Sequence, residues 1–91
     1  MVMRPALVVS ARSIGANGAL AWVAMITNAA REPWPGDVII DGSVELGLIV
    51  PSKVRTSKIS AIEIRSASPL GKVDGETLAR VRRELATNLG L

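Results

Sequence analysis

The sequence contains neither cysteine nor histidine among its 91 residues. Without cysteine the chain has no disulfide framework and no thiolate metal site, which fits an intracellular globular protein. Without histidine it lacks the commonest zinc ligand and the commonest general base. The two absences together exclude the usual zinc chemistry and catalysis by a Ser-His-Asp triad.

Aromatic residues are almost as scarce, because Trp22 and Trp34 are the only two and the chain has no Tyr or Phe. The core must therefore be built from Val, Ile, Leu and Ala. A chain of 91 residues is long enough for one hydrophobic core and too short for a second. We therefore expect residues 1–91 to form a single domain.

Long apolar runs are also missing. No stretch reaches the length of a membrane span, and the N-terminus lacks the basic, apolar and small-residue pattern of a signal peptide. The sequence thus predicts a cytoplasmic protein with no membrane partner.

The formal net charge is +3, and the positive charge is concentrated in the later half of the chain. Between Ser52 and Arg83 the acidic residues are Glu63, Asp74 and Glu76. The basic residues there are Lys53, Arg55, Lys58, Arg65, Lys72, Arg80, Arg82 and Arg83. This half is a candidate anion-binding surface, and the alternative is a solvated basic surface that keeps a small apolar protein soluble.

Most of the chain has the pattern of short strands. Residues 4–10 ("RPALVVS") and 20–27 ("LAWVAMIT") predict two strands, the second central, joined by a loop whose Asn17-Gly18 and Gly15 accept positive φ. Prolines and glycine predict a loop over residues 28–37, followed by a short strand over 37–41. Residues 45–59 alternate well enough for one or two more strands, with Pro51 as a break or an edge, and 60–68 for another. Five or six strands favour a barrel-like antiparallel sheet, because closure hides strand edges.

The C-terminal segment has the clearest pattern. Asp74 can cap a helix with Glu76 in its first turn and Gly90 just past its end. Its apolar residues recur at three- and four-residue steps and are Leu78, Val81, Leu85 and Leu89. We expect this face to pack on the sheet, while arginines occupy the other face.

Four pieces of the sequence, in order and with the right spacing, resemble the MazF/PemK family of type II toxin–antitoxin endoribonucleases. They are "RPALVVS", "AMIT", "WPGDV" with "GLIVPSKVR", and the capped "DGETLARVRRELATNLGL". The resemblance implies a small SH3-like barrel with a C-terminal helix and a homodimer. It also implies sequence-specific, metal- and cofactor-independent cleavage of single-stranded RNA by an mRNA interferase, and a cognate antitoxin with which such toxins can bind operator DNA.

The resemblance also implies a site. The arginine before the first apolar run and the threonine that ends the "I-T" strand, which form the catalytic site of the MazF branch, match Arg4 and Thr27. The alternative is that Arg4 is an exposed strand-end charge and Thr27 an ordinary strand residue. In the PemK branch an arginine and an aspartate two residues later act as acid and base; the arginine matches Arg55, but Ser57 stands in the aspartate's place.

The chemistry suits Arg4 and Thr27, because the nucleophile is the RNA's own 2′-hydroxyl. The protein need only position the backbone and neutralise charge on the phosphate, as guanidinium and hydroxyl donors can. We further expect Lys53, Arg55, Ser57 and Lys58 to bind RNA. Trp34 is a candidate for stacking on a base, or alternatively covers the end of the core.

The chain departs from the family in three places. Only Met1 to Met3 stand where the family has an opening strand, so we expect that strand to be missing. Ser60 and Glu63 replace a further arginine and aspartate, and no general base is evident. Two other functions are therefore open: a catalytically degenerate relative that binds antitoxin and operator DNA, or a gyrase-poisoning relative of the same fold. Incubation with RNA separates the nuclease from both.

Overall fold

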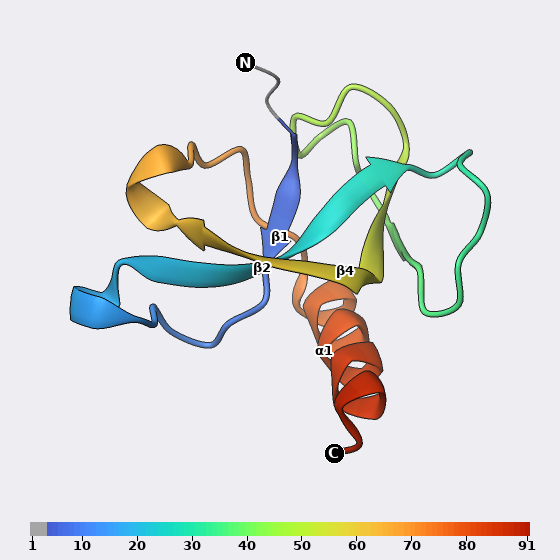
Figure 1. The fold of residues 1–91 in the computed structure, drawn as a ribbon. Coiled ribbons are helices and arrows are strands. Elements are labelled where there is room, and N and C mark those ends of the chain that lie inside the picture. The colour runs from blue at the N-terminus through green and yellow to red at the C-terminus, as the bar shows by residue number, and fades with distance from the viewer. Residues whose placement is uncertain (1–3) are drawn as a thin grey trace.

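The computed structural model describes residues 4–91, and Met1 to Met3, the place of the expected missing strand, lie outside the described residues. Four strands form one antiparallel sheet in the order β1-β2-β4-β3. They are β1 (Ala6–Val8), β2 (Leu20–Asn28), β3 (Val38–Ile40) and β4 (Ser52–Glu63). The other elements are two 3-10 turns, η1 (Ala16–Gly18) and η2 (Ile64–Ser66), and the helix α1 (Gly75–Leu89). The sheet curls into a half-barrel, with α1 on one side (Figure 1).

The strand β2 is central, as its apolar sequence predicts, and β1 and β4 flank it. Pairing with β1 extends slightly beyond the strand, because the Ile26 amide donates to the Pro5 carbonyl at 3.2 Å. The loop before β2 takes the conformation its sequence favours, with positive φ at Gly15 (79°), Asn17 (58°) and Gly18 (64°). The short strand β3 and the loop between β2 and β3 are likewise confirmed.

The curl of the sheet has a local cause. The partners of Ala24 and Met25 on β4 are Ile59 and Arg55, so Thr56, Ser57 and Lys58 are extra residues on β4 at this point. Extra residues in one strand bend it and increase its twist. Both β2 and β4 change direction near the middle of the sheet (Figure 1). This bulge gives the half-barrel its curvature.

The expectation of five or six strands was wrong for the described residues, because residues 41–51 form turns and residues 52–63 form one strand. Gly42 and Gly47 adopt left-handed backbone with φ of 70° and 89°, which ends an extended conformation. The Ser43 hydroxyl donates to the Ile40 carbonyl at 2.8 Å and accepts from the Ser52 amide at 3.0 Å, which closes the loop at its base. The alternation at residues 45–50 therefore reflects a loop that inserts Leu48 into the core.

The helix α1 begins and ends as expected. The Thr77 amide donates to the Asp74 carboxylate at 2.7 Å, and Gly90 closes the helix with a φ of 75°. Its contacts are with β3 and β4. It is also too short to cross a membrane, and no other helix among residues 4–91 is long and apolar enough to do so.

The apolar face of α1 is shorter than the sequence pattern predicts. Val81 is fully buried, and Leu85 packs against the core, but Leu89 is 72% exposed and its predicted packing was wrong. Leu89 lies in the last turn, at the free end of the helix (Figure 1). The main cluster of buried apolar residues consists of Ala24, Val38, Ile40, Leu48, Val54 and Val81.

Replacing Val81 by Ala should therefore destabilise the protein by about 2 kcal/mol, from lost apolar burial plus a residual cavity. In a domain of this size, each kcal/mol corresponds to roughly 4–8 °C in melting temperature. Thermal unfolding measures the effect, and Leu89→Ala is the matched control because it removes a mostly exposed side chain from the same helix. Equal melting temperatures for Val81→Ala and the parent would contradict the described packing.

Candidate nucleic-acid interface

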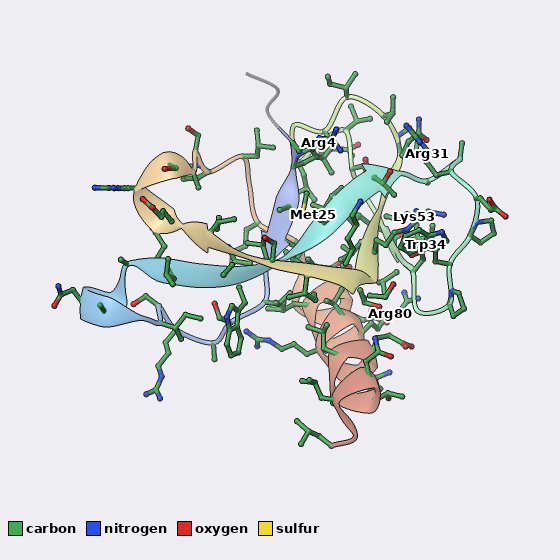
Figure 2. All side chains as sticks on the ribbon, viewed as in Figure 1. Arg4, Met25, Arg31, Trp34, Lys53 and Arg80 are labelled. Atoms are coloured by element: carbon green, nitrogen blue, oxygen red, sulfur yellow. The ribbon has the colours of Figure 1, made fainter. Side chains whose placement is uncertain are left out.

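A polar pocket of about 160 Å³ opens beside the start of β1 and the end of β2. Its lining residues are Arg4, Met25, Ile26, Thr27, Arg31, Arg55 and Lys58. We call it the cationic pocket, because four of these side chains carry positive charge and none is acidic in the part of the chain that the structure describes. Figure 2 shows Arg4 and Arg31 at the same end of the sheet.

Strand register brings Arg4 and Thr27 to this pocket. Ala6 pairs with Met25, and the Ile26 amide bonds to the carbonyl of Pro5. Continuing this antiparallel register by one residue sets Arg4 opposite Thr27. Two residues far apart in the sequence therefore line one pocket.

The bulge in β4 contributes two further cations. Arg55 is paired with Met25 on the near side of the bulge, and Lys58 is the last of the three extra residues. Both side chains line the cationic pocket. Ser57 lies between them and is exposed, but it is not among the lining residues. Bulges commonly redirect side chains near functional sites, and here the bulge places Lys58 beside the pocket.

A second group of interactions lies behind the cationic pocket, where the Asp37 carboxylate contacts two cations of β4. Its Oδ2 is 3.0 Å from Lys53 Nζ and 3.1 Å from Arg55 Nη2, and its Oδ1 accepts from Arg55 Nε at 3.2 Å. The same cations donate to loop carbonyls, Lys53 to Arg31 at 2.7 Å and Arg55 to Glu32 at 2.7 Å. We call these interactions the Asp37 network; they fasten the loop between β2 and β3 to β4.

The Asp37 network changes the interpretation of Lys53. The sequence suggests an RNA-binding residue, but only 4% of this side chain is exposed and its ammonium group is held by Asp37 and the Arg31 carbonyl. In this arrangement Lys53 supports the loop that carries Arg31.

Trp34 lies outside the cationic pocket and contacts Arg55. The guanidinium carbon of Arg55 is 4.0 Å from the centre of the Trp34 ring, which is cation–π geometry. The Trp34 amide also donates to Asp37 Oδ2 at 3.0 Å. Trp34 is 43% exposed, so it does not serve as a buried cover of the core.

Burial raises the pKa of Asp37, but hydrogen bonds from Arg55, the Trp34 amide and Lys53 outweigh it and lower the pKa to about 2. Because this value is below the ordinary 3.8, the network stabilises the fold above pH 3.8 and loses that contribution as the pH falls toward 2. The shift corresponds to on the order of 2 kcal/mol.

We therefore expect Asp37→Asn to be less stable than the parent at neutral pH, because two largely buried cations lose their counter-charge. The difference between parent and variant should shrink between pH 4 and pH 2. Urea unfolding at a series of pH values measures it. A difference that stayed constant with pH would show that the Asp37 charge does not stabilise the fold.

A larger hollow of about 630 Å³ lies at the other end of the β2–β4 pair. Its lining residues are Ala16, Ala19, Leu20, Glu63, Ile64 and Arg65. The two charged residues form an exposed ion pair at 2.8 Å, so this hollow presents no net charge. Of these two hollows, the smaller one is therefore the one with excess positive charge.

Sequence reasoning missed Arg31, Met25 and Ile26 as lining residues and did not identify Asp37 as a structural carboxylate. The basic half recognised in the sequence begins at Ser52, so Arg31 fell outside it. The sequence signal that could have identified Arg31 is its position in the loop that follows the strand containing Thr27.

The structure is thus a small curled antiparallel sheet with a C-terminal helix, and cations cluster beside the strand ends at one pocket. The family model for the PemK-like, MazF-like toxin of type II toxin–antitoxin systems matches residues 2–89. The chain belongs to this family.

Solved structures agree with this assignment. The chain is similar to MazE-MazF from Deinococcus radiodurans, with 29% identity, a TM-score of 0.78, and coverage of 97% of this chain and 82% of that one. It is also similar to an endoribonuclease from a mycobacterial species, with 25% identity, a TM-score of 0.71, and coverage of 97% and 81%. Among curated proteins, none matches the chain.

Proposed function

We propose that this toxin is a metal-independent endoribonuclease that cleaves single-stranded RNA in the cytoplasm. The observation that carries the proposal is the cationic pocket, in which Arg4 and Thr27 are joined by three further cations. Its volume of about 160 Å³ is roughly ten times the ~10–15 Å³ that one ordered water molecule needs, so a phosphodiester group can enter. The similarity to a mycobacterial endoribonuclease supports the same reaction.

In this reaction the 2′-hydroxyl of the RNA attacks the adjacent phosphorus, and the bond from phosphorus to the 5′-oxygen breaks. The 2′-hydroxyl releases its proton, the 5′-oxygen gains one, and the products are a cyclic phosphate and a 5′-hydroxyl. Negative charge grows on the phosphate oxygens in the transition state. Fixed cationic donors stabilise that charge without reorganising, and arginine suits a phosphate through its planar set of donors.

We assign Arg4 and Thr27 to the reacting phosphate as catalytic donors. Arg55 and Lys58 line the same pocket and bind the RNA backbone, as does Arg31. Exposed Ser57 follows Arg55 on the bulge and offers a hydroxyl to a neighbouring nucleotide. Lys53 contributes to RNA binding through the loop that it fastens, and Trp34 contributes beside Arg55.

Replacing Arg4 by Ala should slow RNA cleavage by about 100- to 1000-fold, the usual effect of losing one preorganised donor to a developing anion. Thr27→Ala should be nearly as damaging. The assay follows cleavage of a mixed single-stranded RNA in the presence of a chelator, with the cyclic phosphate detected on the product.

Arg82→Ala is the matched control, because it removes an exposed arginine from α1, away from the cationic pocket. It should retain the parent rate. Full activity in Arg4→Ala would remove Arg4 from the site, and a parent that cuts no RNA would favour the catalytically degenerate toxin. The second outcome has some structural support, because no carboxylate lines the pocket among the described residues and Ser57 occupies the family's aspartate position.

We further propose a homodimer that binds a cognate antitoxin and, with it, operator DNA. The Deinococcus radiodurans structures contain MazE together with MazF, which supports an antitoxin partner here. The net charge of +3 and the cationic pocket favour an extended acidic antitoxin segment, with charge accelerating the encounter.

Association with this antitoxin should weaken steeply with added salt, because exposed charges are screened over about 10 Å at 0.1 M. Titration at low and high salt measures the affinity, and sedimentation measures the mass of the toxin alone. An affinity independent of salt would contradict the electrostatic component, and a monomer would contradict the dimer.

A further inference from the structure

Trp34 has one covered ring face and a large exposed area. The Arg55 guanidinium lies 4.0 Å from the ring centre, so it covers one face. Even so, 43% of the residue is exposed. Trp34 lies on the loop between β2 and β3, in the neighbourhood of Lys53 (Figure 2). One face of the ring therefore lies against a cation, while much of the residue is open to solvent.

The Asp37 carboxylate holds both members of this stack. It accepts from Arg55 Nε and Nη2 at 3.2 and 3.1 Å, which fixes the plane of the guanidinium. It also accepts from the backbone amide of Trp34 at 3.0 Å, which fixes the point where the indole is attached. An exposed tryptophan on a loop would ordinarily sample several rotamers, whereas this one is held against a cation that is itself held.

The same Arg55 lines the cationic pocket. A single side chain therefore separates the Trp34 ring from the place proposed for the phosphate. A ligand that binds both the cationic pocket and the Trp34 ring needs a phosphate for the pocket and a flat ring to stack on the indole. The phosphate and the ring must be close together in the ligand, because only the Arg55 side chain separates their two binding positions. Unpaired nucleotides have this combination, since their bases are free to stack on aromatic side chains.

We propose that Trp34 is a one-sided stacking platform for the unpaired base next to the phosphate in the cationic pocket, and that Asp37 is the positioning residue that builds this platform. The inference deepens the proposed function and rests on it. The base, the indole and the guanidinium would form a three-layer stack. Because every base has a π-face, the platform contributes affinity for single strands and little discrimination among bases.

The first experiment uses the fluorescence of Trp34 as the readout. In Trp22→Phe, Trp34 is the only tryptophan left in the chain. The probe is a short mixed-sequence single-stranded oligodeoxynucleotide, which lacks the attacking 2′-hydroxyl and remains uncut. Its bases should quench Trp34, while a matched abasic strand with the same phosphates should fill the pocket and leave the fluorescence unchanged. Equal quenching by both strands, or none by either, would overturn the platform.

The second experiment removes the platform. Trp34→Leu should bind the base-bearing strand about 5- to 150-fold more weakly, the range measured for single base–aromatic stacks, and bind the abasic strand as the parent does. Trp34→Phe should restore most of the affinity. Trp22→Leu is the matched control, because it removes the other exposed tryptophan, on β2 and outside the pocket lining. Unchanged affinity in Trp34→Leu would contradict the proposal.

The third experiment tests the positioning role of Asp37 with two variants that both weaken the Asp37 network. Asp37→Asn releases Arg55, so the preference for base-bearing over abasic strands should fall. Lys53→Met removes the other cation and loosens the loop, so it should weaken binding of both strands alike. It leaves the contacts of Asp37 with Arg55, so the preference for the base-bearing strand should persist. A purely structural carboxylate would instead lower stability in both variants and leave the preference equal in both.

These outcomes are separable from those of the cleavage assay. Cleavage of RNA without base-dependent quenching of Trp34 would contradict the stacking role of Trp34 and leave the proposed endoribonuclease activity supported. Base-dependent quenching without cleavage would support the stacking role and contradict the endoribonuclease activity.

Discussion

The contact of one carboxylate, Asp37, with two cations of β4 is the interaction on which the candidate site depends. Lys53 and Arg55 point to the side of the sheet where the loop after β2 passes, and neither could remain there largely buried without a counter-charge. Asp37 supplies it, and the remaining donors of both cations satisfy loop carbonyls. The loop that carries Arg31 and Trp34 is thereby held against the sheet by charge-assisted hydrogen bonds, together with a bond from the Thr56 hydroxyl to the Gly36 carbonyl at 2.7 Å.

The curvature of the sheet is the second requirement. If β2 and β4 paired without interruption, the side chains of β4 would alternate regularly and Lys58 would follow that alternation. The three extra residues at the bulge break the alternation and bend the strand, so that Arg55 and Lys58 both line the pocket that opens beside β1 and the end of β2. The pocket thus gathers residues 4, 27, 31, 55 and 58 from four separate parts of the chain.

A pocket lined by four cations is costly for a small protein, because like charges at short range repel one another. The structure lessens this cost by pairing Arg55 with Asp37 from behind, while the face of the pocket stays positive. Binding an anion would relieve the remaining repulsion. Functional sites commonly retain such local conflicts, and the rest of the fold compensates for them. Here the compensation comes from the buried apolar residues of β2, β3, β4 and α1.

Local patterns were sufficient for much of this protein. The central strand, the Gly-rich loop before it, and the capped helix from Asp74 to Gly90 follow from propensity, turn chemistry and capping, which act over a few residues. The pairing of Arg4 with Thr27 came from family resemblance, and strand register accounts for it.

What local patterns could not decide depends on contacts between distant residues. Residues 45–50 alternate like a strand, yet two left-handed glycines and the Ser43 hydroxyl make them a loop. Leu89 continues the helical stripe but extends past the surface that the stripe covers, and is exposed. Lys53 and Arg55 are both cations of the same sequence segment, but they differ in the structure. Lys53 is buried beneath a loop, whereas Arg55 lines the cationic pocket. The sequence by itself determined which segments can form strands, which residues can cap the helix and which side chains are cationic. Only the tertiary structure decided which cations line one pocket, because the Asp37 carboxylate and the bulge in β4 set their positions.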